Sequence, residues 1–163
     1  MTVNKWKTGM LARLLSGVVT LALSNGGGGI AEAGGVPTES EHSVEYFDAA
    51  IVQKAFSSGK PLIAGDGRNF RVMGLRRHGP GEVEVHDRDT DIFYVVRGHA
   101  TFVTGGTLTG GKHTAPDESR GGTLAGGETR PLAQGDVIVI PKGVPHWFKE
   151  VPESIEYFVV KVR

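Results

Sequence analysis

The chain has 163 residues, with 18 Lys and Arg against 18 Asp and Glu, so its formal net charge is zero at pH 7. This balance offers no basic surface of the kind that binds nucleic acid or an anionic membrane. The sequence contains no cysteine, so the fold is stabilised by packing or by a metal, without disulfide bonds.

The first 33 residues have the order of features found in a secretory signal peptide. A basic stretch that ends at Arg13 leads into the apolar run Leu14–Leu23, and small residues follow up to Ala33. The apolar run is about ten residues long, whereas a membrane-spanning helix needs roughly 20. An amphipathic or buried N-terminal helix is the alternative, but the glycines at 26–29 would break its last turn. We therefore expect residues 1–33 to be cleaved, and the mature protein to be periplasmic or secreted.

Cleavage after Ala33 would leave 130 of the 163 residues, the size of one domain. Taking three bases and one acid from 18 and 18 leaves 15 Lys and Arg against 17 Asp and Glu, a balance of −2. We therefore expect neither nucleic acid nor, after cleavage, a membrane as a partner. Residues 34–42 are polar and resemble a flexible linker, and residues 43–163 are predicted to form the single folded domain.

A short helix is predicted at the start of that domain. Ser43 is the candidate N-cap, and the run Gly59-Lys60-Pro61 ends the helical pattern. Apolar residues recur between them at intervals of three and four: Val44, Phe47, Ile51 and Ala55. We expect the apolar face of this helix to pack on an edge of a barrel.

From residue 62 onward, short β-rich runs alternate with turns. The predicted strands are Phe70–Leu75, Glu82–His86, Ile92–Val96, Ala100–Val103, Val137–Ile140, Trp147–Val151 and Ile155–Val162. Many short strands without helices between them indicate an all-β sandwich or barrel. Four Gly-Gly pairs lie between residues 104 and 128, and this segment is predicted to be a long loop at the mouth, with at most a short hairpin at 123–129.

Two segments, Gly79–Gly98 and Gly135–Glu150, resemble the two sequence signatures of the cupin superfamily, in particular its small single-domain members of the type 2 conserved-barrel kind. The second segment matches the family spacing of Gly, five residues, Pro, one residue, Gly, two residues and His, and ends in Glu150 where Asn is usual. The resemblance implies a double-stranded β-helix, also called a cupin or jelly-roll barrel, here with one N-terminal helix.

The same segments contain a candidate metal site. Glu84 and His86 are two residues apart on a predicted strand and therefore share a face. Asp91 follows a polar turn, and His146 follows the tight turn at Pro141-Lys142-Gly143. Two imidazoles and a carboxylate on an inward face are typical of an open site for a divalent metal. We predict His86, Asp91 and His146 as ligands, with Glu84 as a fourth ligand or as a catalytic proton acceptor.

The departures from the family pattern bear on the metal. Cupin signatures usually carry His-x-His followed by Glu, whereas Glu84 replaces the first His and Asp91 replaces the Glu. The extra oxygen makes the predicted site harder, which favours Mn or Fe, leaves Zn or Ni as alternatives and disfavours Cu. Asp91 could instead cap its turn, and Glu84 could pair with Arg76 or Arg77.

The leading functional hypothesis is a metal-dependent cupin enzyme of the oxygenase, isomerase or lyase type, for example a dioxygenase or isomerase. Its substrate would be a small polar molecule inside the barrel. A non-catalytic periplasmic binding or sensing cupin is the alternative, and a structural cupin dimer is a third. A small-molecule ligand is expected in the first two cases, and a homodimer is compatible with all three. The fold by itself selects no reaction.

The export hypothesis makes the first testable prediction. Protein recovered from its native cell should begin at Gly34, because cleavage is expected after the small residue Ala33. N-terminal sequencing or the intact mass measures this directly. Recovery of a chain that still begins at Met1 would contradict the hypothesis.

Overall fold

The structure, a computed structural model, describes residues 43–163. The predicted signal peptide 1–33 and linker 34–42 lie outside the described residues. Within 43–163 the chain forms twelve strands and a single helix, so the predicted all-β barrel with one N-terminal helix is confirmed. In chain order the elements are α1 Ala49–Ser58, β1 Pro61–Ile63, β2 Phe70–Arg77, β3 Glu84–His86, β4 Thr90–Thr104, β5 Thr107–Thr109, β6 Lys112–Ala115, β7 Glu118–Arg120, β8 Thr123–Ala125, β9 Glu128–Ala133, β10 Val137–Ile140, β11 His146–Glu150 and β12 Ile155–Val162.

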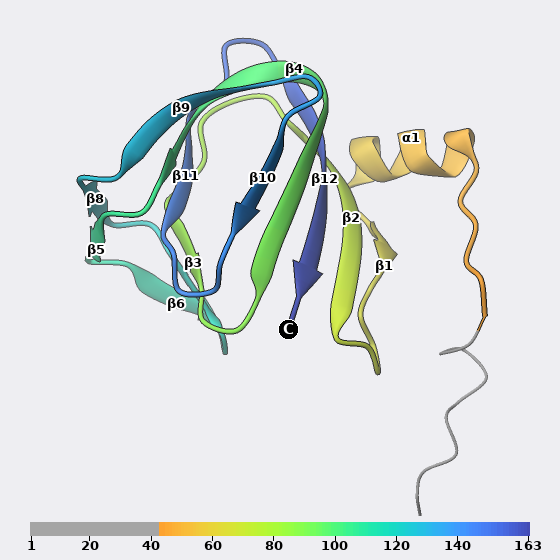
Figure 1. Ribbon diagram of the computed structural model, residues 1–163, viewed down its shortest axis with the longest axis horizontal. Helices are drawn as coiled ribbons and strands as arrows, with labels where there is room; N and C mark the ends of the chain where they lie inside the picture. Colours follow the sequence, from red (N-terminus) through yellow and green to blue (C-terminus); the bar gives the residue numbers. More distant parts are fainter. Residues whose placement is uncertain (1–42) are drawn as a thin grey trace, which may run out of the picture. The chain divides into compact units, whose positions relative to one another are not determined.

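Strand β4 joins two antiparallel halves of the barrel. Its first half pairs with β12 and β10, and this half of the sheet continues through β2 to β1. Its second half pairs with β11 and β9, and this half continues through β3 and β7 to β6. Figure 1 shows β4 arching over the top of the barrel between the two halves.

The bend in β4 depends on Gly98. The sequence pattern predicted two strands, Ile92–Val96 and Ala100–Val103, but the structure has one strand of 15 residues. Gly98 has φ +81°, and a Cβ there would lie 2.0 Å from the carbonyl oxygen of Ser154. Glycine therefore lets the strand turn from one half of the barrel into the other without losing its pairing.

The Gly-rich segment 104–128 is folded into strands, which corrects the prediction of a long loop. Strands β5 and β8 pair with each other, and β6 and β7 form a hairpin whose second strand pairs with β3. The four Gly-Gly pairs stand at both ends of the β5–β8 ladder: 105–106, 110–111, 121–122 and 126–127. At Gly122, for example, φ is +76° and a Cβ would lie 2.4 Å from the oxygen of Thr109. The pairs therefore make the corners of this arm.

Helix α1 begins later than the sequence pattern predicted. Asp48, not Ser43, is the N-cap, because its carboxylate accepts a hydrogen bond of 2.8 Å from the backbone N–H of Ile51. Gly59 ends the helix in the left-handed conformation, as expected. Within 43–163 no helix is long and apolar enough to span a membrane.

The helix covers the outer face of the barrel next to β2 (Figure 1). The ring of Phe56 lies 5.1 Å from the ring of Phe158 on β12, and a Cβ at Gly74 on β2 would approach that Phe56 ring to 3.1 Å. Even-numbered residues of β2 and β12 therefore face the helix. Odd-numbered residues of the same two strands must face the inside of the barrel.

The inside of the barrel is divided between an apolar core and a cavity. Phe93, Phe102 and Phe148 are at most 5% exposed and lie in the core, with ring centroids 4.6–6.0 Å apart. The core extends to the cavity wall, which Met73 and Leu75 line on β2 and Val159 lines on β12. The apolar core therefore lies directly next to the polar side chains of the candidate site.

A matched pair of glycine substitutions tests the bend in β4. Gly98→Ala should lower the free energy of unfolding by about 3 kcal/mol or more, because the new Cβ collides with backbone. Gly135 has a similar φ of +92° with nothing near its Cβ position, so Gly135→Ala should cost only about 1–2 kcal/mol for the left-handed backbone. Urea unfolding measures both, and equal losses would show that the close approach to Ser154 is unimportant.

Candidate metal centre

A cavity of about 370 Å³ opens inside the barrel. Its charged lining consists of four carboxylates and four cations: Glu82, Glu84, Asp91, Glu118, Arg71, Arg77, Arg120 and Lys161. Apolar walls come from inward positions of β2, β4, β11 and β12, and His146 stands among the charged groups. The cavity therefore combines an apolar wall with a dense and charge-balanced polar cluster.

Backbone pairing brings the candidate residues together from distant parts of the chain. His146, the first residue of β11, is directly opposite Glu84 on β3. The N–H of Gly143, in the turn before β11, donates a 2.7 Å hydrogen bond to the carbonyl of His86. Asp91, at the start of β4, lies opposite Ile140, where β10 ends and the same turn begins. One turn thus fixes the two histidines relative to each other.

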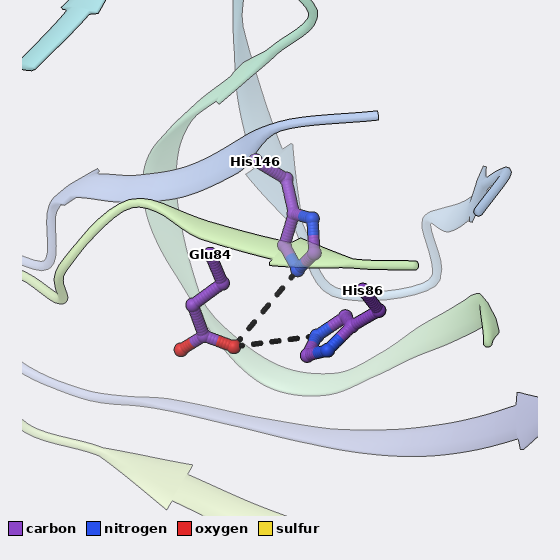
Figure 2. A group of neighbouring side chains, drawn as sticks. All are labelled: Glu84, His86 and His146. Atoms are coloured by element: carbon purple, nitrogen blue, oxygen red, sulfur yellow. Dashed lines mark ion pairs between the residues drawn. The ribbon is translucent and has the colours of Figure 1, made fainter. Parts of the chain in front are cut away.

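Glu84 and Asp91 each place a carboxylate oxygen near both imidazoles. Nε2 of His86 lies 3.6 Å from Oε2 of Glu84 and 3.4 Å from Oδ2 of Asp91. Nε2 of His146 lies 4.0 Å and 3.8 Å from the same two oxygens. Two atoms bound at about 2.1 Å to one ion are about 3 Å apart at a right angle and about 4.2 Å apart when opposite. The observed separations fall in that interval. Figure 2 shows Glu84, His86 and His146 converging on one point.

Each imidazole is oriented through its Nδ1 atom, and its Nε2 atom, which faces the carboxylates, makes no hydrogen bond. Nδ1 of His146 lies 3.2 Å from the carbonyl of Val144, and Nδ1 of His86 lies 3.3 Å from Oε2 of Glu118. Both Nε2 atoms are buried and have no hydrogen-bond partner among the described residues. An imidazole oriented through one nitrogen, with the other free, is the usual arrangement of a metal ligand. Burial also lowers the pKa of His146, so the ring stays neutral as a ligand must.

Glu84 carries its charge in this site. Burial raises the pKa of Glu84, but neighbouring His86 and the positive charge of Arg120 outweigh that effect and lower the pKa to about 2. Its Oε1 accepts a hydrogen bond of 2.7 Å from Nη1 of Arg120, while Oε2 faces the two imidazoles. The residues Glu84, His86 and His146 thus form a group that could hold a metal ion.

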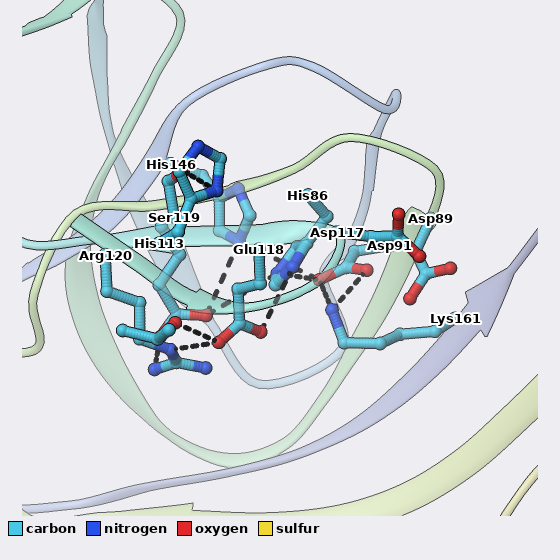
Figure 3. Close-up of polar contacts among 12 residues, drawn as sticks. His86, Asp89, Asp91, His113, Asp117, Glu118, Ser119, Arg120, His146 and Lys161 are labelled. Carbon is cyan, nitrogen blue, oxygen red and sulfur yellow. Dashed lines mark hydrogen bonds and ion pairs between the residues drawn. The ribbon is translucent and has the colours of Figure 1, made fainter. Parts of the chain in front are cut away.

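Asp91 reaches the same centre but already has a cationic partner. Both of its oxygens accept hydrogen bonds of 2.7 Å from Nζ of Lys161 on β12 (Figure 3). The side chains of Asp91 and Lys161 are 3% and 11% exposed. Such a pair is electrostatically balanced with or without a metal, whereas the two Nε2 atoms are not satisfied. The structure therefore places Asp91 beside both imidazoles but in an ion pair with Lys161, and outside the group formed by Glu84, His86 and His146.

Sequence reasoning missed three polar residues of the site. Arg120 on β7 donates hydrogen bonds to Glu84 and, at 2.6 Å, to Oε1 of Glu118, whose other oxygen lies next to His86. Strand β7 therefore holds both Glu84 and His86 in position. The sequence pattern predicted a loop over residues 104–128 and therefore placed neither Glu118 nor Arg120 beside the candidate site. The one available signal was the alternation of Glu118 and Arg120 on one face of a short β-like run. Lys161 carried a comparable signal, an inward position two residues after Val159 on β12.

Comparisons with known proteins agree with the fold. The sequence profile of a family described as Cupin matches residues 70–163. No curated protein is similar enough in sequence to count as a match.

Three solved structures illustrate the likeness. An oxalate decarboxylase variant from Bacillus subtilis is 18% identical, with a TM-score of 0.41, and the match covers 58% of this chain and 21% of that one. A cupin 2 conserved barrel domain protein from Rhodopseudomonas palustris is 18% identical, with a TM-score of 0.43 and coverage of 63% and 57%. Hydroquinone 1,2-dioxygenase from a Sphingomonas species is 12% identical, with a TM-score of 0.49 and coverage of 69% and 72%. The match thus spans about a fifth of the decarboxylase chain, and identities of this size carry no information about reaction or substrate.

A double-mutant cycle tests the pairing of Asp91 with Lys161. In the presence of EDTA, Lys161→Met should lower the free energy of unfolding by about 3 kcal/mol, because it leaves the Asp91 carboxylate buried without a partner. Adding Asp91→Asn to that variant should recover part of the loss, with a coupling energy of about 1–3 kcal/mol. Lys149→Met, on an exposed lysine of β11, is the control and should change stability little. Strictly additive effects in urea unfolding would show that the pair is not coupled.

Proposed function

Because the chain belongs to the cupin family, we propose that it is a metal-dependent cupin enzyme that converts a small polar molecule inside the barrel. One observation carries the proposal: the buried and unpartnered Nε2 atoms of His86 and His146 face the ionised carboxylate of Glu84. Buried polar atoms without partners are rare, and a shared cation satisfies both. Such a cation would polarise an oxygen of the substrate or activate dioxygen.

The residues around the centre have separable roles in this proposal. Glu84, His86 and His146 would hold the metal, and Asp91 would add an oxygen on the side of Lys161. Because the pKa of Glu84 is about 2, its carboxylate accepts a proton poorly near pH 7 and suits the role of ligand better than that of general base. Glu118 contacts His86 and Arg120 contacts Glu84, and these contacts keep the two side chains in position. The apolar side chains of Met73 and Leu75 on β2 line the same cavity.

The choice of ligands favours a hard divalent cation. Two nitrogens with one or two carboxylate oxygens suit Fe(II) or Mn(II) best, while Zn(II) and Ni(II) also accept such a set. We therefore propose Mn or Fe as the native metal. The reaction would be of the oxygenase, isomerase or lyase type, and we further propose that it takes place after export, outside the cytoplasm.

A non-catalytic binding or sensing cupin is the second candidate. It is favoured by the charge balance of the cavity, where Lys161 neutralises Asp91 and Arg120 neutralises Glu84 without any metal. Metal content separates the two candidates in part, because a bare binding barrel requires none. Turnover of candidate substrates then separates an enzyme from a metal-containing binder.

Metal content and thermal stability test the metal-dependent proposal. Protein purified from its native compartment should contain about one Mn or Fe per chain by elemental analysis, and EDTA should lower its melting temperature. His86→Ala and His146→Ala should each abolish stoichiometric metal and remove the response to EDTA, since the metal stabilises the native state only when bound. His99→Ala, on an exposed histidine of β4, should keep both properties. A wild-type protein that lacks metal and is indifferent to EDTA would leave the bare binding barrel as the better account.

A further inference from the structure

Arg77, at the end of β2, is a cation of the cavity wall with no closely bonded carboxylate among the described residues. Its Nη2 comes no nearer than 3.9 Å to Oε1 of Glu84. The other three cations of the wall each have a carboxylate oxygen at 2.7 Å: Lys161 with Asp91, Arg120 with Glu84, and Arg71 with Asp89. The Nε of Arg77 is buried without a hydrogen-bond partner. Arg77 therefore has a charge that is only loosely paired with Glu84 and one buried N–H donor without a partner.

The position of the Arg77 guanidinium is fixed by its surroundings. Its Cζ lies 5.0 Å from the centroid of the Phe148 ring, so the cation stacks on an aromatic face. On another side lies Gly81, where a Cβ would approach Nη1 of Arg77 to 2.9 Å. The carbonyl of Gly81 is itself held by the indole N–H of Trp147 at 2.7 Å. A long cationic side chain held in this way loses little entropy when it binds a ligand.

The groups next to Arg77 complete a pocket that suits a small organic acid. Burial raises the pKa of Tyr157, so its hydroxyl keeps the proton and can donate a hydrogen bond next to Arg77. Met73 and Leu75, the inward residues that precede Arg77 on β2, supply an apolar surface. Four carboxylates and four cations line the cavity, so a divalent metal would leave an excess of positive charge. An anionic occupant would reduce that excess.

We propose that Arg77, next to Phe148 and Tyr157, binds the carboxylate of a small organic acid whose apolar part lies against Met73 and Leu75. The inference rests on the proposed function, because it names the substrate class for the same cavity. Glu84 separates Arg77 from the two imidazoles, so the bound acid lies next to the metal centre. A planar guanidinium matches a carboxylate through two parallel N–H bonds, which an uncharged amide cannot reproduce.

Binding of butyrate and butyramide tests the carboxylate site. These two probes have the same size and differ in charge, and isothermal titration or ligand-observed NMR measures their affinity for the metal-loaded wild type. Butyrate should bind about tenfold or more tightly than butyramide. Equal affinities of the two probes would overturn the proposal.

Two variants assign the preference to Arg77. Arg77→Met should abolish the preference for butyrate, whereas Arg97→Met, on an exposed arginine of β4, should keep it. Gly81→Ala provides a second route that leaves the charge of residue 77 in place, because its Cβ displaces the guanidinium. This variant should reduce the preference several-fold even if Arg77→Met fails to fold. Retention of the full preference in both variants would overturn the proposal.

The metal content of the same samples separates this inference from the proposed function. Arg77 is not among the residues proposed to hold the metal, so Arg77→Met should keep the wild-type metal stoichiometry. A wild type without metal would refute the metal-dependent function, and the comparison of butyrate with butyramide would still decide the carboxylate site. A metal-loaded wild type that binds both probes equally would refute the carboxylate site alone.

Discussion

The continuous pairing of β4 is the constraint on which the rest of this barrel depends. The strand is hydrogen-bonded to β12 and β10 before Gly98 and to β11 and β9 after it. Its alternation therefore fixes which residues of both halves face inward. Asp91 and Phe93 enter the cavity from the first half, and pairing of the second half with β11 sets His146 opposite Glu84. A register slip of one residue in β4 would turn this whole set outward.

The site also buries several charged side chains, and nearly all of these charges have an oppositely charged partner. Asp91 is 2% exposed and His86 is 4% exposed, positions where an unpaired charge is very costly. The carboxylates that line the centre are each matched by a cation from another strand, and the imidazoles are each held through Nδ1. Among residues 43–163, four buried side-chain atoms have no hydrogen-bond partner: Nε2 of His86, Nε2 of His146, Nε of Arg77 and, on an outward position of β12, Oε2 of Glu156. The chemistry that we propose uses the first three of these atoms.

Much of the barrel could be predicted from local sequence pattern, because strand periodicity is a local property. The bounds of β10 and β12 agree with the pattern to the residue, and the shared face of Glu84 and His86 follows from their spacing. The helix start was misplaced because Ser43 and Asp48 are both good N-caps and only the structure shows which one bonds the helix. The Gly-rich arm was missed because its strands have three or four residues each and no apolar alternation. Lys161 could not be assigned to Asp91, since 70 positions separate them and only the register of β12 with β4 brings them together.

The arm between β4 and β9 enters and leaves the barrel at a single point. Thr104 and Glu128 are cross-strand partners, so the 23 residues from 105 to 127 join the barrel like an oversized hairpin turn. Replacing or resizing that arm would leave every barrel strand other than β3 with its own partners. Yet the arm contributes Glu118 and Arg120, which hold two of the central side chains. An insertion or replacement confined to residues 105–127 could therefore change the side chains that position Glu84 and His86 while the strands of the barrel keep their pairing.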